Sequence, residues 1–326
     1  MPTRPANLPP FSSLPLNKDD PPFSAWGLYG PDDQLGFLNR LTDEVVVEAA
    51  KEIKTGVRVS LNWPLDAQSK VPFFGRQVFH KQLINKSPRT VNDDVWTFNT
   101  QSSSQWDGLR HFGYQKAGKF YNGVTQDDIH NPSSGKDPNV NGIQAWAEKG
   151  IVGRGILLDF HRWRLQNNIP MEIFSSNAIP LKYLKAVAES QGTEIKWGDI
   201  LIVRVGYMPA FNALSTEELT ILAKKTPPEL IGVERSEEVL EWIWNNFSAV
   251  AGDHPAFESY PPPKDAPWSL HEVLLSGWGC PIGELFDLEK LAKECERQQR
   301  WSFFVTSEVC NVPGGVASPP NILAIF

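Results

Sequence analysis

Short apolar runs alternate with capped helical segments in the second half of the chain, and this alternation limits the fold more than any other feature. Residues 156–160 and 200–205 are apolar runs of the length typical of buried strands. Ser215-Thr216-Glu217-Glu218 forms a capping box, and Ser236 precedes apolar residues at helical spacing. Strands that alternate with helices in this way predict an α/β fold.

Further elements extend this pattern toward both ends of the chain. Thr42 is expected to cap a helix, and Asp287 to open a late amphipathic helix. Additional strands are predicted at residues 57–63, 95–100, 303–306 and 322–326. Residues 1–25 are rich in proline and lack periodicity, which indicates an irregular arm on the surface or on a partner subunit. No repeat divides the remainder, so residues 26–326 are interpreted as a single domain.

Composition narrows the possible partners. The 326 residues carry a net charge of −7 with a pI near 5.5, whereas nucleic acids and anionic membranes bind basic surfaces. We therefore expect neither partner, and we see no apolar run long enough to span a bilayer. Cys280, Cys295 and Cys310 are too few and too scattered for a disulfide framework, which favours reduced thiols and a cytoplasmic location.

The chemistry is concentrated in residues 101–111, which follow a predicted strand. If this segment is extended, Gln101, Ser103, Gln105 and Asp107 share one face, because side chains alternate along a strand. Amide and carboxylate oxygens together suit a hard divalent cation. His111 lies four residues further on, where a turn could return it to the same place. A polar strand edge has the same composition, so the residues alone leave both interpretations open.

This segment resembles a family signature. It is similar to H-x-G-T-H-x-D-x-P-x-H, the motif of the cyclase-like metal-dependent hydrolases, a family that includes bacterial kynurenine formamidase and isatin hydrolase. Asp107 and His111 match the motif, while Gln101 and Gln105 stand where its first two histidines belong. The family's second half, a histidine followed about a dozen residues later by a glutamate, resembles His271 and Glu284.

The resemblance continues in the same order along the chain. The other similar segments include Trp26-Gly27 and residues 32–36, 153–159, 198–206, 252–258 and 313–320. The resemblance implies a single swivelling β/β/α-type domain, with a mixed sheet and flanking helices. It also implies a homo-oligomer, most simply a dimer.

The resemblance further implies metal-assisted hydrolysis. The expected metal ligands are Gln101, Gln105, Asp107, His271 and Glu284. His111 is expected to act as general acid and base, with Asp107 beside it. A glutamine offers a neutral amide oxygen, harder than imidazole nitrogen, so Mn²⁺ is favoured as the cofactor, and Zn²⁺ or Mg²⁺ stays open. A capping box at residues 269–272 would mount His271 firmly at the start of a helix.

The expected function is hydrolysis of a C–N or C–O bond in a small cyclic or aromatic amide, lactam or ester. Two alternatives stay open: a metal-free lyase, dehydratase or cyclase that uses Asp107 and His111, and a family member that binds a small molecule without catalysis. Aromatic residues in the matched segments suit a flat substrate, although core packing explains them equally well. The candidate substrate-binding residues are Trp26, Trp106, Tyr121, Trp278 and Gly314.

Two other segments carry weaker expectations. Residues 116–141, which contain Tyr121, form a long loop that is predicted to be a lid or a pocket wall. His254 follows a predicted strand and is expected at the rim of the site, with Asp253 and Glu258 as structural hydrogen-bond partners.

Overall fold

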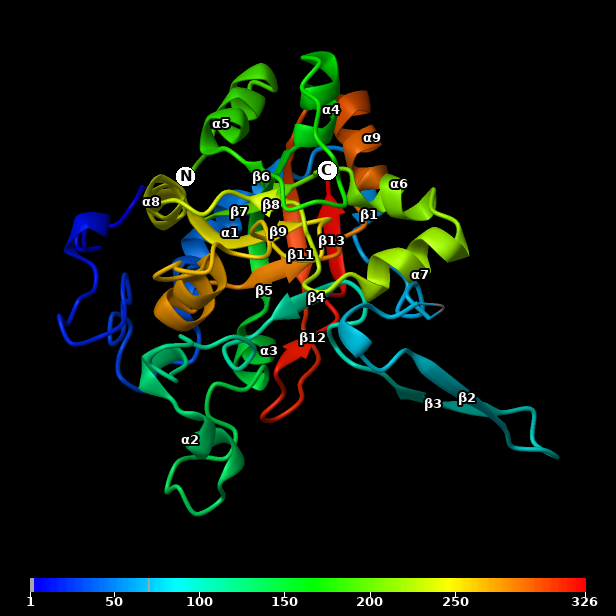
Figure 1. The fold of residues 1–326 in the computed structure, drawn as a ribbon, viewed down its shortest axis with the longest axis horizontal. Coiled ribbons are helices and arrows are strands. Elements are labelled where there is room, and N and C mark those ends of the chain that lie inside the picture. Colours follow the sequence, from blue (N-terminus) through cyan, green and yellow to red (C-terminus); the bar gives the residue numbers. More distant parts are fainter. Residues whose placement is uncertain (1–2, 70) are drawn as a thin grey trace.

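A central mixed sheet organises the molecule. The computed structural model describes residues 3–69 and 71–326. The nine strands of the sheet follow the order β1-β13-β11-β5-β7-β9-β10-β4-β12 (Figure 1). They are β1 Arg58–Ser60, β4 Gln105–Asp107, β5 Ile151–Leu158, β7 Asp199–Val203, β9 Phe247–Gly252, β10 Ile282–Glu284, β11 Ser302–Ser307, β12 Ala317–Ser318 and β13 Ile322–Ile325. Strands β5, β7, β9 and β10 pair in parallel, whereas the remaining pairs are antiparallel. The predicted α/β fold with a mixed sheet and flanking helices is confirmed.

Three helices start where their caps predict, whereas the helix expected to open at Asp287 begins at Glu289. Thr42, Ser215 and Ser236 each accept a hydrogen bond from a backbone N–H in the first turn of their helices. The α-helices are α1 Asp43–Ala49, α2 Gln126–His130, α3 Gln144–Lys149, α4 Phe160–Gln166, α5 Leu181–Ser190, α6 Tyr207–Asn212, α7 Thr216–Lys224, α8 Glu237–Asn246 and α9 Glu289–Gln298. Short 3₁₀ turns are η1 Phe11–Ser13, η2 Gly36–Arg40, η3 Ala50–Glu52, η4 Phe73–Gly75 and η5 Tyr121–Gly123, and η6 Glu272–Gly277 is a π-helix.

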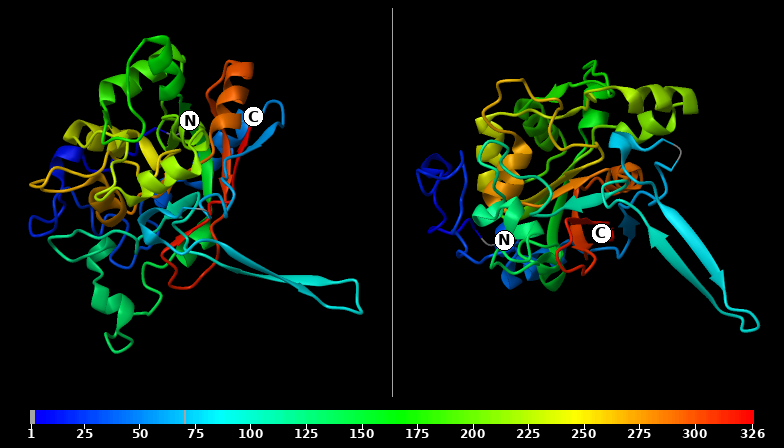
Figure 2. Two further views of the ribbon diagram at one scale, coloured as in Figure 1. Left: turned by 45° about the vertical axis from the view of Figure 1, so that its right-hand side comes forward. Right: turned by 60° about the horizontal axis from the view of Figure 1, so that its bottom comes forward.

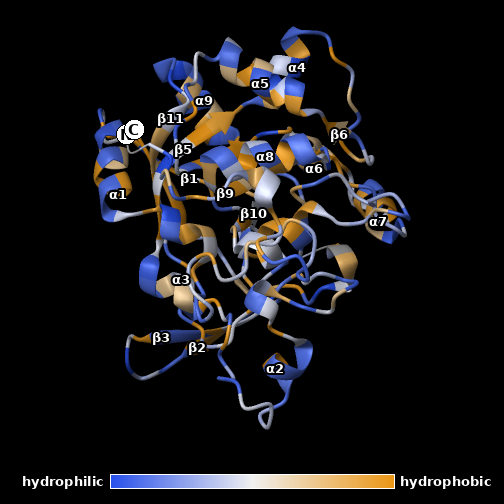
Figure 3. Cartoon of the chain, turned by 90° about the vertical axis from the view of Figure 1, so that its left-hand side faces the viewer, coloured by the Kyte–Doolittle hydropathy of each residue, from blue (hydrophilic) through white to orange (hydrophobic). Residues whose placement is uncertain are grey.

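Each face of the sheet has its own hydrophobic core. In β5, Ile156 and Leu158 pack with residues of α5, α8 and η6, whereas Leu157 between them packs with residues of α1, α3 and α9. This division follows from the alternation of side chains along a strand. It explains why β5 and β7 are almost continuously apolar: both faces are covered. Figure 3 shows the hydrophobic residues concentrated on the central strands and the helix faces beside them.

The N-terminal arm packs against its own chain. The indole Nε1 of Trp244 donates to the carbonyl of Pro9 at 3.0 Å, and that of Trp278 donates to the carbonyl of Phe23 at 2.7 Å. Phe11 stacks on Phe23 with ring centroids 5.4 Å apart. Within the described ranges, no helix combines the length and apolarity needed to cross a bilayer.

Two small pairs of strands lie outside the main sheet. Strands β6 Ala178–Ile179 and β8 Gly232–Val233 pair in parallel. Strands β2 His80–Asn85 and β3 Asn92–Thr97 form an antiparallel hairpin that extends well away from the body (Figure 2). The predicted strand at 95–100 corresponds to the end of β3, so the chain leaves the hairpin before it reaches Gln101.

Candidate functional site

The pairing of β4 with β10 brings the two halves of the sequence signature together. Gln105 lies directly opposite Glu284, and Asp107 lies opposite Ile282. Because side chains alternate along a strand, Gln105, Asp107 and Glu284 share one face of this pair. The Gln105 Nε2 group donates to Glu284 Oε2 at 2.9 Å across the two strands. All three side chains are buried.

Gln101 reaches this face from a turn, not from an extended strand. The Gln101 backbone N–H donates to Asn99 Oδ1 at 2.8 Å, and Ser103 Oγ donates to the carbonyl of Pro64 at 2.9 Å. The turn directs the Gln101 side chain toward the site, where its Nε2 donates to Asp107 Oδ1 and its Oε1 accepts from Gln105 Nε2 at 3.2 Å. The expectation that Ser103 shares the site face is therefore wrong, because strand alternation begins only at Gln105.

His271 is held at the start of the π-helix η6 by a carboxylate. The predicted capping box forms, since Ser269 N donates to Glu272 Oε2 and Glu272 N donates to Ser269 Oγ. Glu258 accepts from the backbone N–H groups of Leu270 and His271 at 2.9 and 2.8 Å. Its Oε1 also lies 2.8 Å from His271 Nδ1, which fixes the orientation of the ring. The other ring nitrogen, Nε2, lies 3.1 Å from Glu284 Oε1.

Three side chains converge on one point. A ligand atom from each of Asp107, His271 and Glu284 lies within 4.8 Å of the others. Burial and the nearby Asp107 carboxylate raise the pKa of Glu284 to about 7. Hydrogen bonds and charge from Glu258 and Glu284 outweigh the burial of His271 and raise its pKa well above the usual value. Asp107 Oδ2 and Gln105 Oε1 are buried without a hydrogen-bond partner.

A cavity of about 220 Å³ opens beside this cluster. His111 lines it, with its Nε2 3.9 Å from Asp107 Oδ2. Burial lowers the pKa of His111, which favours the neutral form of its ring. Arg76 also lines the cavity, where its guanidinium donates to the carbonyl of Gln101 at 3.0 Å and lies 4.7 Å from the centre of the Phe74 ring. The remaining walls are Phe112, Leu230, Pro255, Ala256, Tyr260, Pro262 and Ser269, with Glu258, His271 and Glu284 beneath them.

The five candidate substrate-binding residues lie away from the lining of this cavity. Trp106 points to the opposite face of β4, where it packs edge-on against Phe286, because it is one residue out of phase with Gln105 and Asp107. Trp278 is buried and stacks on Phe37.

The other three candidates have structural contacts. Tyr121 is buried and donates to Asp33 at 2.9 Å, and Trp26 donates to the carbonyl of Ser276 at 2.6 Å. Gly314 accepts from Arg110 at 2.9 Å. The predicted lid at 116–141 contributes no residue to the cavity lining; through Asn122 it binds the backbone of Gly27, Gly30 and Asp33 instead.

The neighbourhood of Asp253 is structural, as predicted. Its carboxylate accepts from the backbone N–H groups of Val205, Gly206 and Tyr207 at 2.7, 2.9 and 2.8 Å. His254 is fully buried and does not lie at the rim of the site, and burial lowers its pKa to about 3.

No sequence motif indicates Arg76, because this residue lies in a loop of the chain. The contact between Glu258 and His271 could be anticipated from the sequence, because both residues lie in segments that resemble the family.

Comparisons with known proteins identify the family of this chain. The model of the family "Cyclase", described as "Putative cyclase", matches residues 38–259. A crystal structure of a novel cyclase is 30% identical, with a TM-score of 0.78, and the match covers 93% of this chain and 99% of that one. No protein with curated annotation matches this chain.

Isatin hydrolases share the fold at lower identity. Isatin hydrolase A from Ralstonia solanacearum is 13% identical with a TM-score of 0.56, covering 83% of this chain and 92% of that chain. An isatin hydrolase bound to the product analogue thioisatinate is 11% identical with a TM-score of 0.56, covering 85% of this chain and 93% of that chain. The family match spans well over half of the sequence, and the novel cyclase is similar over nearly its whole length. The expected resemblance is confirmed, and the chain belongs to the Cyclase family.

Proposed function

We propose that this protein is a divalent-metal-dependent hydrolase that cleaves a C–N or C–O bond in a small cyclic or aromatic amide, lactam or ester. One observation carries the proposal: buried Asp107 and Glu284 converge with His271 beside an open cavity. Buried acidic groups so close together repel one another unless a proton or a cation lies between them. Burial, together with repulsion from Asp107, raises the pKa of Glu284 to about 7.

The residues present fit a cation. Asp107 Oδ2 and Gln105 Oε1 are buried and unpartnered, as free ligand atoms would be. The contact between Glu258 and His271 Nδ1 leaves Nε2 as the ligand atom, an arrangement that recurs at metal-binding histidines. Oxygen donors outnumber nitrogen donors here, which favours Mn²⁺ over Zn²⁺ and leaves Mg²⁺ open. Asp107, His271 and Glu284 would be the principal ligands, and Gln101 and Gln105 weaker ones.

The chain's own residues supply the remaining parts of a hydrolysis. When bound, the cation would polarise a substrate carbonyl and lower the pKa of a water molecule. Neutral His111, at the cavity wall beside Asp107, can accept a proton from the attacking water and return it to the leaving nitrogen or oxygen. Arg76 places a positive charge in the same cavity, where it would stabilise the carboxylate that hydrolysis releases.

The cavity limits the substrate. Its volume of about 220 Å³ suits a molecule of one or two rings. Phe112 and Tyr260 offer aromatic surfaces, and Phe112 lies edge-on to His271 with ring centroids 5.5 Å apart. Phe112 and Tyr260, instead of the tryptophans, are therefore the aromatic residues proposed to contact the substrate. A small molecule as partner and a cytoplasmic location remain part of the proposal.

A metal-free reaction is a second candidate, favoured by a specific observation. The Gln101 and Gln105 amides donate to Asp107 and Glu284, so that each carboxylate has a hydrogen bond without a cation. Asp107 and His111 would then form the acid–base pair of a lyase, dehydratase or cyclase.

Turnover in ¹⁸O-labelled water separates the two candidates. The purified protein, loaded with Mn²⁺, is incubated with a panel of aryl amides, lactams and esters, and the products are analysed by mass spectrometry. Hydrolysis places one ¹⁸O atom in the product carboxylate, and a chelator abolishes the reaction. Turnover without incorporation of the label, or turnover that the chelator leaves unchanged, would refute metal-dependent hydrolysis.

A further inference from the structure

Arg40, in the 3₁₀ turn η2, is a buried cation without an acidic partner among the residues that the structure describes. It is 3% exposed. Its Nη1 donates to the carbonyls of Trp244 and Phe247 at 2.9 and 2.7 Å, and its Nε donates to the Tyr29 hydroxyl at 3.4 Å. Its Nη2 is buried and has no hydrogen-bond partner. Burial of a guanidinium is costly unless every donor is satisfied and an opposite charge lies nearby.

Aromatic rings and a helix end compensate this charge only in part. The guanidinium carbon lies 3.2 Å from the centre of the Phe37 ring, 4.7 Å from that of Trp197 and 5.1 Å from that of Trp244. The Trp244 carbonyl belongs to the last turn of α8, where the helix dipole supplies about half an elementary negative charge. Burial nevertheless lowers the pKa of Arg40, and the groups that oppose this most strongly are a phenol and a thiol, not a carboxylate.

A second guanidinium lies near the first, on the N-terminal arm. Arg4 Nη2 donates to the carbonyl of Pro9 at 2.8 Å, whereas Arg4 Nε is buried without a partner. The positive charge of Arg4 lowers the pKa of Arg40 further. In the part of the chain that the structure describes, neither arginine forms an ion pair with a carboxylate. Two like charges therefore approach one another without an opposite charge to balance them.

A cavity of about 280 Å³ lies beside Arg40, between the N-terminal arm, η2 and the start of α1. We refer to it as the arm cavity. None of the residues that line it is acidic. Besides Arg40, its walls combine hydroxyl groups with apolar side chains, among them Tyr29, Thr42, Leu8 and Trp197. It shares no lining residue with the cavity beside Asp107 and Glu284, so it is a separate site.

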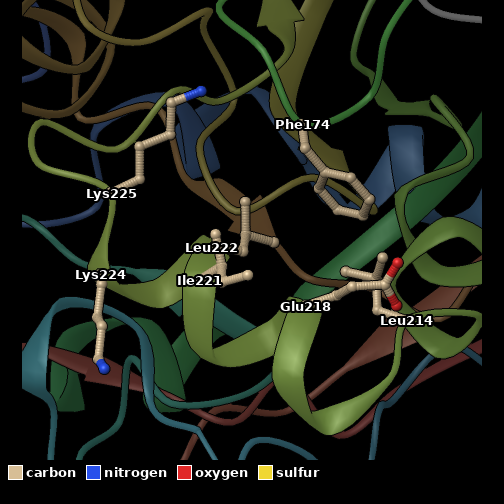
Figure 4. A pocket seen from close by; sticks show the side chains of 7 residues that line it. All are labelled: Phe174, Leu214, Glu218, Ile221, Leu222, Lys224 and Lys225. Carbon is tan, nitrogen blue, oxygen red and sulfur yellow. The ribbon is translucent and has the colours of Figure 1, made fainter.

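The larger groove beside α7 shows what an ordinary charged surface looks like in this protein. Figure 4 shows Lys224 and Lys225 on one side of this groove and Glu218 on the other. Both lysines are exposed, and Lys225 forms an ion pair with Glu229 at 2.7 Å. Water and neighbouring carboxylates balance these charges. The buried and unbalanced charge of the arm cavity is therefore not a general property of its surface cations.

We propose that the arm cavity binds a small organic carboxylate. The carboxylate would balance the charges of Arg40 and Arg4 and accept hydrogen bonds from their unpartnered N–H groups, a pairing that is strong where water is excluded. The apolar part of the ligand would contact Leu8 and Trp197. An inorganic oxyanion would balance the charge as well, but it would leave these apolar walls without a contact. The proposal is independent of the hydrolysis, because it involves no residue of the metal cluster.

Isothermal titration calorimetry of the full chain tests this site. A chelator is present, so that no cation offers a second place for an anion. The probes are benzoate and hexanoate, their neutral amides, and inorganic phosphate. Each carboxylate should bind at one site per chain and at least about tenfold more tightly than its amide, because the amide carries no charge. Phosphate should bind more weakly than the carboxylates.

Variants assign the binding to the arm cavity. Arg40→Gln should remove the preference for carboxylates, and Arg4→Gln should weaken carboxylate binding about tenfold. Arg4→Gln keeps the test valid if Arg40→Gln does not fold, because Arg4 lies on the arm and donates only to the carbonyl of Pro9. Circular dichroism reports the fold of each variant. Lys224→Gln is the matched control: it removes an equal charge from the groove in Figure 4 and should leave binding unchanged.

Four results would each overturn the proposal. The first is that no carboxylate binds more tightly than its amide. The second is carboxylate binding that every folded variant at Arg4 and Arg40 leaves unchanged. The third is loss of this binding in Arg76→Gln, which would place the ligand in the other cavity. The fourth is tighter binding of phosphate than of either carboxylate, which would make the arm cavity a site for inorganic oxyanions.

Discussion

The two halves of the site use their polar groups differently. On the β4 side, the neutral amides of Gln101 and Gln105 donate to the carboxylates of Asp107 and Glu284. On the β10 side, Glu258 holds His271 through both its backbone and its ring. In the first half, the glutamine amides form hydrogen bonds to carboxylates, whereas in the second half a carboxylate orients the imidazole ring of His271. In the proposed metal centre, Asp107, His271 and Glu284 would therefore be the strong ligands, and the two glutamines would adjust them.

Removing a principal ligand should have the largest effect. Asp107→Ala or Glu284→Ala is expected to abolish metal binding and to lower turnover at least about a thousandfold, because the cation loses a charged ligand. Elemental mass spectrometry and product analysis measure both effects. Glu241→Ala, which removes an exposed carboxylate on α8, is the control. Loss of turnover with an unchanged metal content would contradict the ligand assignment.

Removing the proton carrier should separate turnover from metal binding. His111→Ala is expected to lower turnover about 10²- to 10⁴-fold, the usual range for a general acid–base residue, and to leave the metal content unchanged. The measurement is turnover alongside metal content in the same preparation. A protein that loses its metal together with His111 would make this histidine a ligand.

Releasing the His271 ring tests the stronger half of the site. Glu258→Gln is expected to weaken metal binding and turnover about 10- to 100-fold, as loss of a group that orients a metal-binding histidine does. The metal dissociation constant, measured by competition with a chelator, reports the change. Gln105→Ala removes a neutral group from the other half and should have a smaller effect. A larger loss of metal affinity in Gln105→Ala than in Glu258→Gln would contradict the proposed difference between the two halves of the site.

Rebuilding the weaker half should sharpen the comparison. Gln101→His with Gln105→His introduces imidazole ligands and is expected to raise zinc affinity about tenfold or more, because imidazole is a stronger donor for zinc than an amide oxygen. Competition titrations with Zn²⁺ and Mn²⁺ show the change in preference. An unchanged preference would mean that residues 101 and 105 do not approach the cation.

The sequence predicted much of the fold because its signals are local. Thr42, Ser215 and Ser236 cap helices through groups within one turn. Of the predicted strand at 200–205, residues 200–203 lie in β7, and their side chains contribute to both cores. The assignment of Trp106 to substrate binding has no geometric support, because a shift of one residue on β4 moves a side chain to the other face.

The long-range contacts of the site were harder to predict. The pairing of β4 with β10 joins residues far apart in the chain, and only the family resemblance pointed to it. Arg76 lies in an irregular segment, and no periodic pattern in the sequence predicts that this segment borders the cavity. Gln101 reaches the site through a hydrogen-bonded turn, which sequence reasoning treated as an extended strand.

The metal content of the purified protein tests the central proposal most directly. Elemental mass spectrometry is applied after dialysis against Mn²⁺ or Zn²⁺ and removal of free ions, to the unaltered chain and to Glu284→Ala. About one divalent ion per chain, bound by the unaltered protein and absent from Glu284→Ala, is the predicted result. No metal under either loading condition would contradict it and would leave Asp107 and His111 as the centre of a metal-free reaction.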